Sequence, residues 1–304
     1  MAVDAFCLIL AMLGLGMLFS RTRTLPDNAA EVLNAVVLYV CLPAAVLTYV
    51  PRLHLDVSLL GIAATPWLLM LATLAILVPL ARWLRLERQT FAVLLLCVAL
   101  GNSSFIGYPM VRALLGEDAL PYAVVYDQFG TFILLSTFGL YVLARYSGQT
   151  PPATKQILLR VAKFPPLWAL LFALTLMPEQ PPHWIGSALK SLSDAMLPLV
   201  MLAVGFSIRL RLGRDELAPL GIGLLLKLAV MPALAVPLSW LFGLHGAMLQ
   251  ANVLESAMPS MITAAALAIS HKLAPRLAAA LVGYGIVLSL ATLPAWVWVI
   301  RQLG

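Results

Sequence analysis

Charged residues and cysteines are scarce in this sequence. Of its 304 residues, 11% are Asp, Glu, Lys or Arg, whereas 62% are hydrophobic. Soluble domains usually contain about 25% charged and about 45–50% apolar residues. The shortage of charge therefore excludes an ordinary soluble domain and predicts an all-α polytopic membrane protein.

Several motifs of enzymes and metalloproteins are also missing. The sequence has no G-x-x-x-x-G-K-[ST] phosphate-binding loop, no H-E-x-x-H helix and no C-x-x-C pair. Its cysteines, Cys7, Cys41 and Cys97, lie in apolar runs without metal-ligand spacing, and their odd number argues against a disulfide framework. We therefore expect neither an enzyme nor a resident cofactor or metal.

Apolar runs of membrane-spanning length recur along the whole chain. Runs of about 17–25 residues predict transmembrane helices. We expect ten of them, at residues 3–20, 32–50, 57–81, 90–114, 119–144, 163–178, 185–208, 216–241, 246–270 and 276–300. The first run lacks the basic stretch and the cleavage site of a secretion signal, so we expect it to be retained.

The basic residues are distributed unevenly over the connections between these helices. The even-numbered connections carry Arg52 and Arg112. The odd-numbered connections carry Arg21, Arg23, Arg82, Arg85, Arg88, Arg145, Lys155, Arg160, Lys163, Arg209, Arg211, Arg214, Lys272 and Arg276. Because basic loops stay in the cytoplasm, this bias predicts a multi-pass protein of the cytoplasmic (inner) membrane with both termini outside. The residues form no basic patch, so we expect a lipid bilayer and no nucleic acid as partner.

Five spans in each half predict an inverted repeat. Residues 1–145 would form the first repeat and residues 162–304 the second, joined by a cytoplasmic linker at 146–161. Since five is odd, the second half enters the membrane from the opposite side. Pro43 and Pro198 support the repeat, because they lie in the similar segments YVCLPAAVL and AMLPLVMLA.

A second matched pair of prolines interrupts the fourth and ninth helices. Pro109 lies in GNSSFIGYPM (101–110) and Pro259 in LESAMPSMIT (254–263). Proline removes a backbone donor and clashes with the preceding turn, so each helix should break there and leave unpaired backbone groups at membrane depth. Paired broken helices that cross are typical of the binding site of an inverted-repeat transporter. Packing kinks lined by small residues are the alternative.

The residues around the two breaks are the candidate substrate-binding residues. Helix ends would offer amide donors and unwound carbonyl acceptors there, and polar side chains would add specificity. The candidates are Asn102, Ser103, Ser104, Gly107, Pro109, Met258, Pro259, Ser260 and Thr263.

Ionisable residues inside the spans form a second set of candidates, because a charge at the bilayer centre needs a partner or a function. Glu255 lies one turn before the second break and would bind a coupling proton or a cation such as sodium. The alternative is that Glu255 is a neutral carboxylic acid that hydrogen-bonds to neighbouring backbone groups. Asp127 would share this coupling role or line an outer vestibule.

Two further ionisable residues are assigned different roles, Lys227 to charge compensation and Asp194 to a structural ion pair. Lys227 would hold an anion or offset the negative ends of the broken helices, and an ion pair with Asp127 or Glu255 is the alternative. Asp194 follows Lys190 by four residues, a helical spacing that predicts a structural ion pair between them.

The motifs together resemble the auxin efflux carrier family in its short bacterial form, within the bile acid/auxin transporter-like superfamily. They are VCLPA, then N-x-x-F-x-G-x-P from Asn102 to Pro109, L-K-L-x-x-x-P from Leu226 to Pro232, and A-M-P at 257–259. Many members carry an asparagine shortly after the last proline, where this chain has Thr263.

The resemblance implies a fold like that of bile-acid transporters and sodium/proton antiporters. Helices 1, 2, 6 and 7 would form a scaffold, and helices 3–5 and 8–10 a transport domain. It also implies a homodimer, elevator-type alternating access, organic anions as substrates, and Asn102 as a substrate-contacting residue.

We therefore expect a secondary active transporter of a small organic anion, either auxin-like or a mono- or dicarboxylate. A cation/proton antiporter is the main alternative, in which the carboxylates are the ion site. A non-transporting sensor on the same scaffold is another. An intramembrane enzyme would need a catalytic pair at one depth, and no histidine lies in the middle of a span.

Overall fold

The computed structural model describes residues 2–53, 56–148, 153–207, 213 and 216–303, and the basic residues Arg209, Arg211 and Arg214 lie outside them. The described residues are almost entirely helical. The α-helices are α1 (Ala2–Thr22), α2 (Ala29–Val36), α3 (Leu42–Tyr49), α4 (Ser58–Trp83), α5 (Arg88–Ala99), α6 (Tyr108–Leu115), α7 (Leu120–Tyr126), α8 (Phe132–Leu134), α9 (Leu140–Ser147), α10 (Thr154–Ala162), α11 (Pro165–Thr175), α12 (His183–Asp194), α13 (Met196–Ser207), α14 (Leu217–Leu225), α15 (Met231–Leu241), α16 (Gly246–Ser256), α17 (Ile262–Ser270) and α18 (Pro275–Leu303). Shorter π-helical segments are η1 (Val37–Cys41), η3 (Ser103–Gly107), η5 (Asp127–Thr131), η6 (Leu135–Gly139) and η8 (Leu226–Val230), and 3₁₀ turns are η2 (Val50–Arg52) and η4 (Glu117–Ala119).

Helices occupy all ten ranges that the sequence predicts, and α10 covers the second half of the predicted linker and ends one residue beyond it. Among the described residues, six continuous helical segments are long and apolar enough to cross a membrane: Ala29–Arg52, Ser58–Trp83, Glu117–Ser147, His183–Ser207, Leu217–Leu241 and Pro275–Leu303. Shorter apolar helices cover Cys7–Thr22, Arg88–Ala99 and Pro165–Thr175. The protein is thus a polytopic membrane protein, while ten crossings and the inverted repeat stay predictions.

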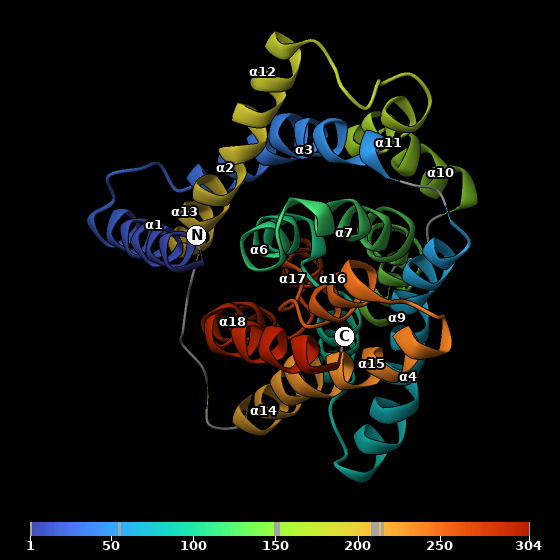
Figure 1. The fold of residues 1–304 in the computed structure, drawn as a ribbon. Helices are drawn as coiled ribbons and strands as arrows, with labels where there is room; N and C mark the ends of the chain where they lie inside the picture. The colour runs from blue at the N-terminus through green and yellow to red at the C-terminus, as the bar shows by residue number, and fades with distance from the viewer. Residues whose placement is uncertain (1, 54–55, 149–152, 208–212, 214–215, 304) are drawn as a thin grey trace.

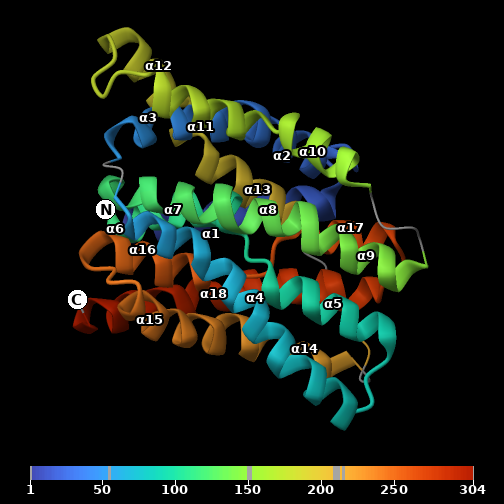
Figure 2. The same cartoon turned by 90° about the vertical axis from the view of Figure 1, so that its right-hand side faces the viewer.

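The helices form two groups that lie side by side (Figures 1 and 2). In the peripheral group, α13 packs on α1 and α2, and α3 packs on α11 and α12. The central group contains α4–α9 and α14–α18, with α16 against α7, α15 and α18. The two groups hold the same helices as the predicted scaffold and transport domain, whose roles stay predictions. Both termini lie at one end of the molecule (Figure 2).

Three prolines begin helices that follow a wide π-helical turn. Pro43, Pro109 and Pro232 lie in the first turns of α3, α6 and α15, directly after η1, η3 and η8. Proline lacks the amide hydrogen that an α-helix needs, and a wider turn accommodates its ring. Consequently Pro109 is not the point at which its helix is interrupted, contrary to the prediction.

Candidate functional site

The two interrupted helices meet at their breaks. The first break lies at residues 100–102, between α5 and η3, and the second lies at residues 257–261, between α16 and α17. Gly101 and Ser260 form an isolated antiparallel bridge. The Asn102 amide donates to the Pro259 carbonyl at 2.8 Å, and the Met261 amide donates to the Leu100 carbonyl at 2.9 Å. Each break therefore satisfies part of the backbone that the other exposes.

Two helical N-termini start at these breaks. Segment η3 begins at Ser103 and helix α17 begins at Ile262, and neither start is capped by a side-chain hydrogen bond. Uncapped N-terminal amides carry a partial positive charge and favour anions. The two starts thus place amide donors on either side of the bridged segments.

Asn102 lies beside the first of these N-termini. Its side chain is completely buried, and neither its Oδ1 nor its Nδ2 has a hydrogen-bond partner. A buried amide without partners is rare, because the desolvation of each polar atom is then uncompensated. The Asn102 side chain is therefore free to donate to and accept from a bound molecule.

Asp127, on η5, is the centre of a buried hydrogen-bond network. Ser103 Oγ donates to its Oδ1 at 2.6 Å, and Tyr108 Oη and Gln128 Nε2 donate to its Oδ2 at 3.1 and 3.0 Å. Its side chain is 1% exposed, so the predicted position in an outer vestibule is wrong. The network joins η5 to η3 and so fixes the first break.

Glu255 has the opposite environment. It lies at the end of α16, is completely buried, and neither carboxylate oxygen has a hydrogen-bond partner. The predicted alternative of a hydrogen-bonded neutral acid is therefore wrong. The carboxylate lies against Gly107, where an added Cβ would overlap both of its oxygens.

Lys227 lies near the C-terminal ends of α5 and α16, the two helices that precede the breaks. Its Nζ donates to the Ser256 carbonyl at 3.4 Å, and a Cβ at Gly101 would lie 2.9 Å from it. The ammonium thus offsets the negative end of α16, as one of the two predictions stated. The described residues show no ion pair of Lys227 with Asp127 or Glu255, so that alternative is wrong.

The remaining candidates differ in their access to solvent. Ser104, Gly107, Pro109, Met258, Pro259 and Ser260 are buried, and Thr263 is partly exposed. The described residues contain no group of three or more His, Cys, Asp or Glu side chains that could hold a metal ion.

Sequence reasoning missed the tyrosine and amide residues that hold the site together. Besides Tyr108 and Gln128, Tyr126 Oη lies 3.2 Å from Ser256 Oγ. Asn252 donates to Thr65 at 3.1 Å and to Ser239 at 2.9 Å. Polar side chains within apolar runs were the available signal, because such residues need partners inside a membrane protein.

Two of the cavities that the described residues line between the peripheral and central groups lie next to the helices that follow the breaks. The larger, of about 830 Å³, reaches Tyr108 and Pro109. The smaller, of about 250 Å³, lies between α2 and α13 on one side and α17 and α18 on the other, and reaches Ile262. Small-molecule sites usually measure about 300–1,000 Å³. Neither lining includes Asn102 or Glu255; the larger cavity is lined by α6, which follows the first break, and the smaller by α17, which follows the second.

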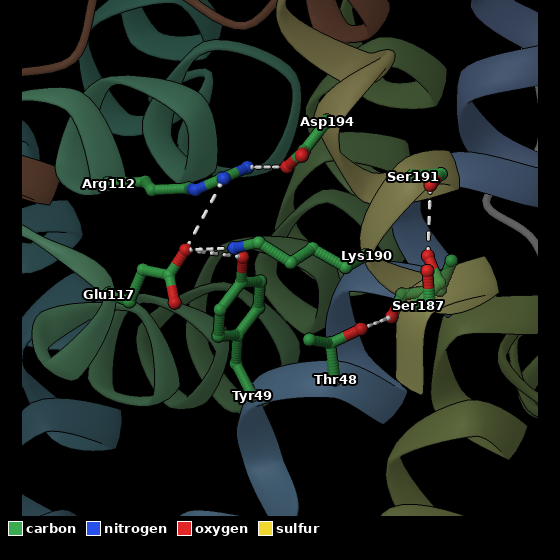
Figure 3. Close-up of polar contacts among 9 residues, drawn as sticks. Thr48, Tyr49, Arg112, Glu117, Ser187, Lys190, Ser191 and Asp194 are labelled. Carbon is green, nitrogen blue, oxygen red and sulfur yellow. Dashed lines mark hydrogen bonds and ion pairs between the residues drawn. The ribbon is translucent and has the colours of Figure 1, made fainter. Parts of the chain in front are cut away.

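Ion pairs link the two groups at the larger cavity (Figure 3). Arg112 of α6 pairs with Asp194 of α12, and Lys190 of α12 pairs with Glu117 of η4. Tyr49 of α3 donates to Glu117 at 3.4 Å. The predicted helical pair of Lys190 with Asp194 is wrong, since each of them binds a residue of the central group instead.

Comparison with known proteins assigns the family. A family model described as "membrane transport protein" matches residues 2–297. The chain belongs to this family. An uncharacterized transporter of Methanothermobacter thermautotrophicus is 31% identical over 293 residues, which are 95% of each chain. A second uncharacterized transporter, from Methanocaldococcus jannaschii, is 27% identical over an alignment of 310 positions that covers 98% of each chain.

A plant relative supports the narrower resemblance. Auxin efflux carrier component 6 of Arabidopsis thaliana is 26% identical over 190 residues, which are 60% of this chain and 31% of the plant protein. The predicted membership of the auxin efflux carrier family is confirmed.

Proposed function

We propose that this protein is a secondary active transporter of a small organic anion, auxin-like or a mono- or dicarboxylate, in the cytoplasmic membrane. The observation that carries the proposal is the unpartnered, buried side chain of Asn102 beside two uncapped helical N-termini. Amide donors from Asn102 and from these N-termini would bind a carboxylate. Apolar neighbours such as Met258 would contact the rest of the solute.

The position of the breaks supports alternating access. A solute bound there would reach one side through the larger cavity and the other side through the smaller one. Elevator motion would move the central group along the peripheral group and open the cavities in turn. Both termini and the larger cavity would face outside, and the peripheral group would form the homodimer contact.

Glu255 and Asp127 would couple transport to an ion. A buried carboxylate without partners is costly when charged, so Glu255 would bind a proton or a sodium ion together with the solute. Asp127 already accepts hydrogen bonds from Ser103, Tyr108 and Gln128, and would position the break and support this coupling role.

Cation/proton antiport is the second candidate function, because Glu255 is a buried, unpartnered acid near a second acid. In that case the carboxylates alone would be the ion site and Asn102 would not contact a solute. Organic-anion transport fits the unpartnered amide of Asn102 better, since its Nδ2 is a donor that a carboxylate can accept from and a cation cannot use.

Uptake into proteoliposomes tests the proposal. Purified protein should accumulate labelled succinate or indole-3-acetate, and Asn102→Ala should reduce uptake at least about tenfold, the scale of one lost charge-assisted hydrogen bond. Asn28→Ala, at an exposed asparagine, is the matched control and should behave as the wild type. Cation flux without carboxylate flux would favour antiport, and ligand binding without any flux would favour a sensor.

A further inference from the structure

The larger cavity is lined by an arginine of α6, the helix that follows the first break. Pro109 and Arg112 both line it, and both belong to α6. Residues three apart lie on one face of a helix, so Arg112 lies one turn beyond Pro109 along the cavity. Asp194 lines the cavity from the peripheral group. A solute that enters this cavity thus meets the Arg112–Asp194 pair, one helical turn away from Pro109.

The guanidinium of Arg112 is held by two acids. It pairs with Asp194, and its Nη2 lies 3.3 Å from Glu117 Oε1. The side chain of Arg112 is 27% exposed and that of Asp194 is 46% exposed. Ion pairs this accessible to water are weak, and the planar guanidinium fork fits any carboxylate. A carboxylate from solution can therefore take the place of Asp194.

A second arginine gives the cavity an additional positive charge. Arg301 of α18 lines it and donates from Nη2 to the Leu114 carbonyl at 3.1 Å. A guanidinium has five donor hydrogens, so this single bond leaves several available. The cavity thus offers cationic groups on α6 and α18 of the central group.

We infer that Arg112 is a recognition residue for the carboxylate of the transported anion, which displaces Asp194 from the guanidinium in the larger cavity. The inference rests on the proposed function and adds an outer binding step to it. Asp194 belongs to the peripheral group, whereas Arg112 belongs to the central group. Displacement therefore removes a link between the groups when a solute is present, and helps the loaded central group to move.

Two variants of the same ion pair separate recognition from simple structural support. Removing Asp194 deletes a competitor for Arg112, so Asp194→Asn should bind succinate or indole-3-acetate about tenfold more tightly. Removing the guanidinium deletes the binding group, so Arg112→Gln should weaken binding about tenfold or more. If the ion pair only stabilises the structure, both substitutions should change the affinity in the same direction. Isothermal titration of the purified protein in lipid nanodiscs measures both.

Lys190→Gln is the matched control. It breaks the second ion pair that the described residues form between the groups, without removing a partner of Arg112, and should leave the affinity within about twofold. If Arg112→Gln does not fold, Arg112→Lys, which keeps the charge and loses the fork, replaces it and should also weaken binding.

The inference is overturned if folded Asp194→Asn binds both probes as tightly as the wild type or more weakly. It is also overturned if neither the wild type nor the variant binds a probe. Carboxylate uptake into proteoliposomes is measured separately. If the protein takes up carboxylates but the two variants do not shift the affinity in opposite directions, this inference alone is rejected. If the affinities shift in opposite directions but no uptake occurs, the proposed transport function alone is rejected.

Discussion

Glu255 lies so close to Gly107 that residue 107 has no room for a side chain. A Cβ at this position would overlap both carboxylate oxygens of Glu255. The contact joins the end of α16 to η3, and thus holds one interrupted helix against the other. Because glycine has only a hydrogen in place of a side chain, the buried carboxylate of Glu255 can lie beside residue 107.

Gly107→Ala should therefore lower the stability of the folded protein by about 1–3 kcal/mol, because overpacking displaces Glu255 or η3. The midpoint of thermal unfolding in detergent should fall accordingly. Gly221→Ala is the control, since its Cβ would meet no atom within 4 Å. Adding Glu255→Ala to Gly107→Ala should restore the midpoint, and no restoration would contradict the proposed contact.

Tyr108→Phe should remove one of the hydrogen bonds to Asp127 and leave Tyr108's ring in place. The expected cost is about 1 kcal/mol, the usual net value of a buried hydrogen bond. Denaturant unfolding of the purified protein should show it. Tyr39→Phe, at a tyrosine that is 63% exposed, is the control. Equal stability of Tyr108→Phe and the wild type would argue against the network.

Glu255→Gln should remove the ion dependence of transport. Wild-type uptake is expected to change with sodium or with pH, because Glu255 is the buried acid without a hydrogen-bond partner. The glutamine variant keeps the shape but not the titratable group, so its residual uptake should respond to neither. Glu179→Gln, at an exposed glutamate, should keep the wild-type dependence. An unchanged ion dependence in Glu255→Gln would remove this residue from the coupling site.

The positions of the helices were predictable because apolar runs of membrane length report helices directly. The interruption near Pro259 was also predictable, since this proline lies within the break at 257–261. The other interruption lies at residues 100–102 and not at Pro109, because the π-helical segment η3 precedes this proline and accommodates it. A local sequence rule does not reveal such a turn.

The partners of charged residues were less predictable than the residues themselves. Asp194 and Lys190 have the spacing of a helical pair, but their side chains reach Arg112 of α6 and Glu117 of η4. Those partners are far away in the chain, so a single sequence carries no sign of them. The buried hydrogen bonds that Tyr108 and Gln128 donate to Asp127 also became visible only in the structure, because they depend on how the side chains are oriented.

The central claim is that the breaks form a binding site reached alternately from the two cavities, and cysteine labelling tests it most directly. Ser104→Cys would be made after Cys7, Cys41 and Cys97 are replaced, and uptake by this variant would be verified first. In sealed vesicles of known orientation, a membrane-impermeant thiol reagent should modify residue 104 when applied to either side. A transported carboxylate should slow both reactions. Modification from one side only, unaffected by carboxylate, would contradict the account.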